Sequence, residues 1–300
     1  MLRTSILLAA MTALFGVVGF ALGGEAGMLI ALAVAAATNL FAWWGSDGMV
    51  LRMHHARPVG PQDAPRLHAI TADLAARAGL PMPALYIIEE DQPNAFATGR
   101  SPDRAAVALN TGLLRLMPER EVAAVIAHEL AHIRNRDTLI MTVTAALAGA
   151  IGLLAQFGMM CRGRSTDSRA SPFGLVGLLL LAVLAPIGAM IVQLAISRGR
   201  EFEADRLGAE ILGEAEPLAS ALLRLEGATA QHVNQAAEAN PATAHLFIVN
   251  PLAGLRLDGL FRTHPRTADR VAALRGPGVP RPRIATPTAR PWARRNPWQR

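Results

Sequence analysis

The residues best suited to chemistry form an H-E-x-x-H motif made by His128, Glu129 and His132. Apolar residues recur at helical spacing around the motif, which predicts a helix over Pro118–Arg136. Two histidines four residues apart lie one above the other on a helix face, so both can bind one zinc ion. Glu129 is displaced sideways, where it can reach a water molecule at the metal. The motif therefore predicts a catalytic zinc site, but it supplies only two of the ligands.

A third ligand is expected because catalytic zinc sites use three protein ligands and keep one position open. The best candidate is Glu201, at the start of a helix predicted over residues 198–213. Asp205 lies one turn further along the same helix face, where it could hydrogen bond to a ligand histidine. Spacing alone leaves another interpretation open, in which Glu201 is a surface acid that pairs with Arg198 or Arg200.

The composition indicates a membrane protein, because apolar residues make up 52% of the 300-residue chain and charged residues only 17%. The single cysteine, Cys161, excludes an intramolecular disulfide and a cysteine-rich zinc module. The net charge of +6 arises in the last 25 residues, which contain six arginines and no acid. A basic tail of this kind suits contact with anionic lipid headgroups, and it gives no reason to expect a nucleic-acid partner.

Four uncharged apolar runs could form membrane-spanning helices. The first two, Thr4–Gly24 and Ala26–Gly45, are each about 20 residues long and are separated only by Glu25, which predicts a helical hairpin. A cleaved signal peptide is the alternative for the first run, but a second span follows at once. The other two runs are Thr138–Cys161 and Ser171–Ile196. They are predicted to span the bilayer, with a shallow position against the protein as the alternative.

The positive-inside rule orients the hairpin, because arginines lie on both of its outer ends. Arg3 precedes the first run and Arg52 follows the second. Both ends of the hairpin, and the H-E-x-x-H helix that follows them, are therefore expected to face the cytoplasm.

The remaining sequence predicts a small, mostly helical domain with a short sheet. Strands are predicted over residues 85–88 and 105–109, with a possible third, edge strand over 94–99. Helices are predicted over 61–79, 216–227 and 266–274. The apolar run 246–249 could dip to the membrane surface. Residues 276–300 are rich in proline and arginine, which favours disorder.

Three separated motifs resemble the HtpX family of bacterial membrane zinc endopeptidases, which are similar to the eukaryotic CAAX prenyl proteases. They are HELAHIRNRD at 128–137, SRGREFEAD at 197–205 and NAFATG at 94–99. The resemblance covers the chain from the first hairpin to about Leu274. It implies one zinc per chain, bound by His128, His132 and Glu201, with Glu129 as catalytic base and Asp205 hydrogen bonded behind the ligands.

The same resemblance implies two further groups of functional residues. His264 matches a late His-Pro motif of the family, so it is expected to stabilise the oxyanion with support from Arg270. Arg266 stands where the family often has a second proline. The other group is the strand that binds substrate through its main chain. Its residues are Asn94, Ala95, Phe96, Ala97, Thr98 and Gly99.

The expected fold is α+β and mostly helical, with about four hydrophobic helices and a gluzincin-like catalytic domain. The predicted divisions are a transmembrane hairpin (1–50), a first catalytic part (51–137), a second hairpin (138–197), a second catalytic part (198–275) and a disordered tail (276–300). The resemblance implies a multi-pass protein of the bacterial inner membrane that cleaves misfolded membrane proteins. A narrower processing peptidase and a non-enzymatic membrane adaptor with a structural metal remain alternatives, and the oligomeric state is open.

Overall fold

The computed structural model describes residues 2–145, 198–229, 231–252, 265–277 and 279. Most of the third and fourth apolar runs, the predicted loop residue His264 and nearly all of the basic tail lie outside these residues. Within them, no helix combines the length and the apolar character that crossing a membrane requires.

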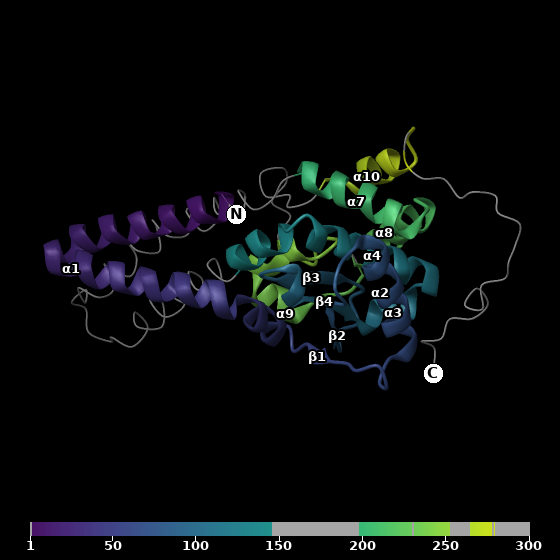
Figure 1. The fold of residues 1–300 in the computed structure, drawn as a ribbon, viewed down its shortest axis with the longest axis horizontal. Coiled ribbons are helices and arrows are strands. Elements are labelled where there is room, and N and C mark those ends of the chain that lie inside the picture. The colour runs from purple at the N-terminus through teal and green to yellow at the C-terminus, as the bar shows by residue number, and fades with distance from the viewer. Residues whose placement is uncertain (1, 146–197, 230, 253–264, 278, 280–300) are drawn as a thin grey trace, which may run out of the picture.

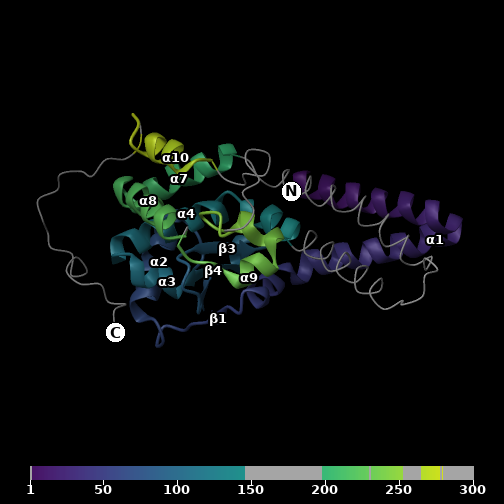
Figure 2. The same cartoon turned by 180° about the vertical axis from the view of Figure 1, so that it is seen from behind.

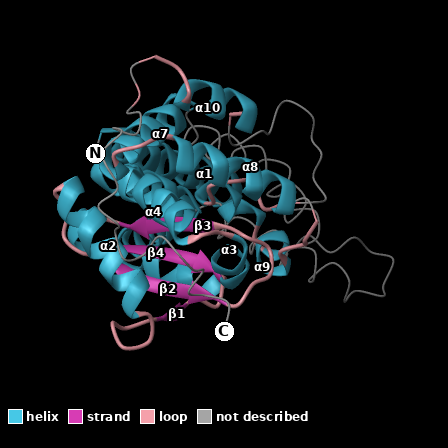
Figure 3. Cartoon of the chain, turned by 90° about the vertical axis from the view of Figure 1, so that its right-hand side faces the viewer, coloured by secondary structure: helices cyan, strands magenta, loops and turns pink. Residues whose placement is uncertain are grey.

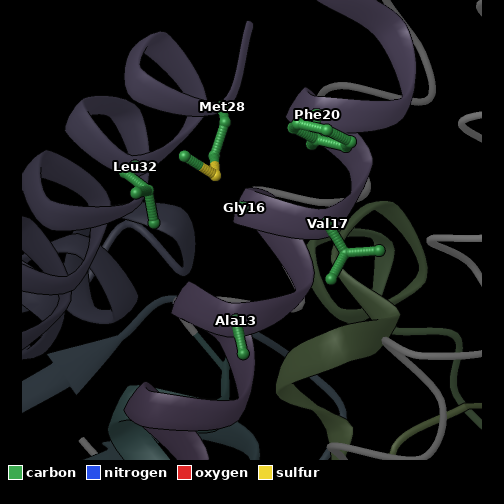
Figure 4. Close-up of a pocket in the computed structure, with 6 residues that line it drawn as sticks. All are labelled: Ala13, Gly16, Val17, Phe20, Met28 and Leu32. Carbon is green, nitrogen blue, oxygen red and sulfur yellow. The ribbon is translucent and has the colours of Figure 1, made fainter. Parts of the chain in front are cut away.

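The first helix, α1 (Leu2–Met53), folds back on itself at Gly24, whose φ of 59° lies in the left-handed region. Its two arms run side by side and project from the rest of the protein (Figure 1). The Asn39 amide donates to Thr12 Oγ1 across the arms at 2.8 Å. Near the fold-back point, a small apolar hollow lies between the arms (Figure 4). It is lined by Ala13, Gly16, Val17, Phe20, Met28 and Leu32.

A four-stranded mixed sheet forms the centre of the remaining fold. Its strands are β1 (Arg57–Pro58), β2 (Ala84–Ile88), β3 (Ala95–Gly99) and β4 (Ala105–Asn110), in the order β1-β2-β4-β3. β2 pairs with β4 in parallel, whereas β3 pairs with β4 antiparallel. β3 therefore lies at one end of the sheet, as the sequence predicted, although all five of its residues are buried.

Helices follow the sheet in close agreement with the sequence patterns. α2 (Pro65–Ala78) ends at Gly79, which adopts a φ of 68° as a left-handed cap. α4 (Glu119–Arg134) carries the H-E-x-x-H motif, and residues 137–145 are again helical. The later helices are α7 (Arg198–Leu212), α8 (Glu216–Thr229) and α10 (Thr267–Leu274). The shorter helices are α3 (Thr111–Leu116) and α9 (Gln235–Ala239), with 3-10 turns η1 (Pro102–Arg104) and η2 (Pro241–Leu246).

α4 is the central helix, packed between the sheet on one side and α7 and α8 on the other (Figures 1 and 3). Its apolar side chains belong to the main core, which also takes in α2 and one face of the sheet. The opposite face of the sheet packs against the end of α1, residues 140–145 and Phe247. The view from behind shows the same layers, with α9 beside the lower end of α1 (Figure 2).

Candidate active site

The two histidines of the motif and Glu201 meet where α4 and α7 pack together. The His128 and His132 rings have centroids 4.8 Å apart, one helical turn separating them. A Cβ on Gly208 of α7 would lie 2.9 Å from His128 Cα, so only glycine lets α7 approach α4 this closely. This approach brings Glu201, from the first turn of α7, to both histidines.

The three side chains have the geometry of a zinc site. One ligand atom from each of His128, His132 and Glu201 lies within 4.8 Å of the others, and all three residues are buried. The Nε2 atoms of His132 and His128 are 3.6 and 3.9 Å from the Glu201 carboxylate oxygens. Tetrahedral ligands at zinc distances are separated by roughly 3.3 Å. The nitrogen and carboxylate donors and their spacing therefore fit zinc.

His132 is held from behind by Asp137, which the sequence reasoning did not single out. Its Nδ1 lies 3.2 Å from Asp137 Oδ2, so its Nε2 is the nitrogen that faces Glu201. Burial opposes the charged form of His132, but the bond to Asp137 and the Glu201 carboxylate outweigh it and raise its pKa to about 9. Asp137 could have been found from its place five residues after His132 in the HELAHIRNRD motif.

His128 has a different carboxylate behind it. Its Nδ1 lies 3.0 Å from Asp205 Oδ1. Asp205 in turn receives two hydrogen bonds from the buried Arg270, from Nε at 2.7 Å and from Nη2 at 2.6 Å. Although burial favours the neutral acid, the Arg270 charge holds the pKa of Asp205 well below its usual range. Burial then dominates at His128 and lowers its pKa.

Glu129 lies beside the ligand cluster in a dry environment. Burial is the main cause that raises its pKa to about 7, and the Glu201 carboxylate adds to it, while His132 acts in the opposite direction. The backbone N–H of Ala97 on β3 donates to the Glu129 carboxylate. A carboxyl group with a pKa near neutrality is suited to accepting and returning a proton.

The structure brings most of the predicted site residues together, and Arg270 joins them from α10. Its Nη1 lies 3.6 Å from Glu201 Oε2. By contrast, Glu203 points away from the cluster and pairs with Arg206 at the surface. His264 lies outside the described residues.

The apolar run 246–249 was expected to be able to reach the membrane surface, and the structure corrects this. Leu246, Phe247 and Ile248 are each at most 2% exposed. They pack inside the protein, next to β3.

A helix with two histidine ligands and an adjacent glutamate, completed by a carboxylate from a later helix, defines the site of a zinc peptidase. The sequence comparison agrees, because residues 61–277 match the profile described as Peptidase family M48. This match covers most of the chain, and the protein belongs to that family. Zinc is the metal of M48 metalloproteases, and the cluster of His128, His132 and Glu201 can bind it.

Among solved structures, the chain is similar to Ste24p from S. mikatae, with a TM-score of 0.52 and 18% sequence identity. The similarity covers 89% of this chain and 62% of Ste24p, so this chain spans about three-fifths of the length of that protein. At this level of identity the comparison establishes a shared fold.

Proposed function

We propose that this protein is a membrane-bound zinc endopeptidase whose site is built by His128, His132, Glu201 and Glu129. The observation that carries the proposal is the buried cluster of three zinc ligands with an unmodified glutamate beside it. A purely structural metal site would not need a buried carboxyl group of raised pKa next to its ligands. Membership of a peptidase family supports the same function.

A bound zinc ion would supply a Lewis acid that polarises the peptide carbonyl and acidifies water. Glu129 takes up the proton of the attacking water and returns it to the leaving amine. Burial assists this role, because it brings the proton affinity of the Glu129 carboxyl close to the value that allows both uptake and release near neutral pH.

We assign the stabilisation of the oxyanion to His264, with Arg270 in support. Arg270 is fixed by its two bonds to Asp205, which keep its guanidinium at the edge of the ligand cluster. Asp205 and Asp137 orient the two histidines, since each faces an Nδ1 atom and leaves Nε2 for the metal. β3 and the preceding Asn94 are assigned to the main chain of the substrate.

The hydrophobic runs assign this peptidase to the bacterial inner membrane, with its site facing the cytoplasm. Residues 1–50 and 138–197 form the two proposed transmembrane hairpins, and 51–137 and 198–275 the two parts of the catalytic domain. Misfolded membrane proteins are the proposed substrates. A processing peptidase with narrow specificity is the second candidate, which the shared fold with Ste24p favours.

The test is proteolysis of an unfolded protein by the purified chain in detergent, with zinc, with a chelator and as Glu129→Gln. Cleavage should require zinc, and Glu129→Gln should lower kcat by about 10²–10⁴-fold, the usual contribution of a general base. Full activity in Glu129→Gln would refute the mechanism. A survey of cleaved sequences separates the two substrate classes, because cleavage confined to one motif would remove the quality-control assignment.

A further inference from the structure

The outer edge of β3 is where a peptide could add to the sheet. The Asn110 N–H donates to the Asn94 carbonyl oxygen at 3.0 Å, so residues 94, 96 and 98 turn their main-chain groups toward β4. The alternation of an antiparallel pair then turns the main-chain groups of residues 95, 97 and 99 outward. These outward groups are the ones that an added strand would use.

The first part of this edge is already taken by Leu246–Val249, which we name the cover segment. The Ile248 N–H donates to the Ala95 carbonyl oxygen at 3.1 Å. The Asn94 side chain bonds both main-chain groups of Val249, donating to its carbonyl oxygen at 2.7 Å and accepting from its N–H at 3.4 Å. An antiparallel bridge joins Phe247 to Phe96. The cover segment thus uses the bonds that a substrate strand would otherwise make.

The cover segment is part of the packed fold and not a loose loop. The Phe247 ring lies 5.1 Å from the rings of both Phe96 and His54, with edge-to-face geometry to each. The Ile248 carbonyl oxygen accepts from Arg270 Nη1 at 2.9 Å. Opening the segment would therefore break an aromatic cluster and remove a partner of a buried arginine, which is costly.

The edge opens next to the proposed catalytic base. The Ala97 N–H donates to the Glu129 carboxylate. Among the described residues, no hydrogen-bond partner is recorded for the Ala97 carbonyl oxygen. Beyond it, the Gly99 N–H is 3.4 Å from Thr142 Oγ1, a weak contact. Main-chain pairing is thus possible only over Ala97–Gly99.

We propose that the cover segment permanently replaces substrate along Asn94–Phe96, so that a peptide pairs with β3 only on one side of the bond that is cut. The proposal rests on the proposed peptidase function. A peptide strand that continued past Ala97 would meet the main chain of Phe247 and must leave the sheet. Its recognition on that side would then depend on side chains, whereas the paired side tolerates many sequences.

The permanence of the cover segment is tested by hydrogen exchange of individual amides in the full chain, in detergent, without any substrate. The Ile248 amide should be protected within tenfold of the Asn110 amide inside the sheet, and far more than the His232 amide at the exposed end of α8. Addition of excess unfolded peptide to Glu129→Gln should not change this protection. Exchange like that of His232, or exchange that rises with peptide, would overturn the proposal whether or not the protein is a peptidase.

One-sided pairing is tested with a cleavable peptide in which single main-chain amides are N-methylated, leaving the scissile amide intact. Methylation at the paired positions should lower kcat/KM by roughly tenfold, the loss of one hydrogen bond. Methylation on the other side should change it less than twofold. Sensitive positions on both sides would overturn the proposal. If no peptide is cleaved at all, the proposed function fails, and the exchange result still decides the state of the cover segment.

Discussion

The two zinc-binding histidines lie one turn apart on the same helix, yet their surroundings have opposite electrostatic effects. Each Nδ1 faces a buried aspartate, Asp205 for His128 and Asp137 for His132. The pKa of His128 is nevertheless lowered, while that of His132 is raised to about 9.

The difference arises from what neutralises each aspartate. Arg270 makes two short hydrogen bonds to Asp205, so its negative charge is balanced and little of it favours a proton on His128. Arg200 stands 3.9 Å from Asp137, a much looser pair. The half of the site around His128 is therefore a neutral, structural unit. The half around His132 keeps an excess of negative charge that a dication would balance.

The largest effect is expected from Arg270→Met, which breaks the neutral unit. The substitution leaves Asp205 charged and buried without its partner, and should lower the free energy of unfolding by about 3–5 kcal/mol. Urea unfolding in detergent measures this loss. Arg275→Met is the matched control, because Arg275 pairs with Glu216 in solvent and should give no resolvable change. Equal losses in the two variants would show that Arg270 has no special structural role.

A smaller effect is expected from Asp137→Asn, which alters the other half of the site. Asparagine keeps the shape but removes the charge that orients and polarises His132, so zinc affinity should fall about 10–100-fold. Competition with a chelating dye measures the affinity. Glu203→Gln, on the exposed face of α7, should leave it unchanged. An unaltered affinity in Asp137→Asn would contradict the role given to Asp137.

The pH dependence of zinc binding follows from the raised pKa of His132. Below about pH 9 the ring holds a proton that zinc must displace. The apparent affinity should therefore rise with pH, by about tenfold per unit for this proton, and level off near pH 9. In Asp137→Asn the levelling should occur at lower pH. Calorimetric titration at several pH values measures both; an affinity that is flat from pH 7 to 9 would disagree.

The smallest effect is expected from Arg200→Gln. Losing this cation leaves the negative charge of Asp137 less compensated, so the pKa of His132 should rise by a few tenths of a unit. The pH at which zinc affinity levels off should move up by the same amount. Arg200→Lys keeps the charge and should behave as the wild type does. A downward shift in Arg200→Gln would mean that Arg200 is not coupled to this pair.

Local patterns predicted most of the elements around the site. Apolar spacing and caps placed α2, α4, α7, α8 and α10 within a few residues, and Gly79 ends α2 as predicted. The two-residue strand β1 and the short helix α3 were missed, because neither is long enough to show a period. The strand order was also beyond local reasoning, since the parallel pairing of β2 with β4 depends on contacts between distant segments.

The site shows the same division. Helical spacing brought His128 and His132 together, but spacing alone could not choose between a ligand and a surface acid for Glu201. That choice depends on how closely α7 approaches α4 at Gly208, which is a tertiary contact. The roles of Asp137 and the cover segment were missed for the same reason. The exposure expected for β3 was wrong because residues from beyond α9 fold back over it.

The central claim is that His128, His132 and Glu201 hold one zinc ion for catalysis. Its most direct test combines the zinc content of the purified chain with X-ray absorption at the zinc edge. We predict one zinc per chain in the wild type and in Glu129→Gln, surrounded by nitrogen and oxygen only, with the zinc lost from Glu201→Ala. Absence of zinc from the wild type, sulfur in its coordination shell, or full retention in Glu201→Ala would contradict the claim.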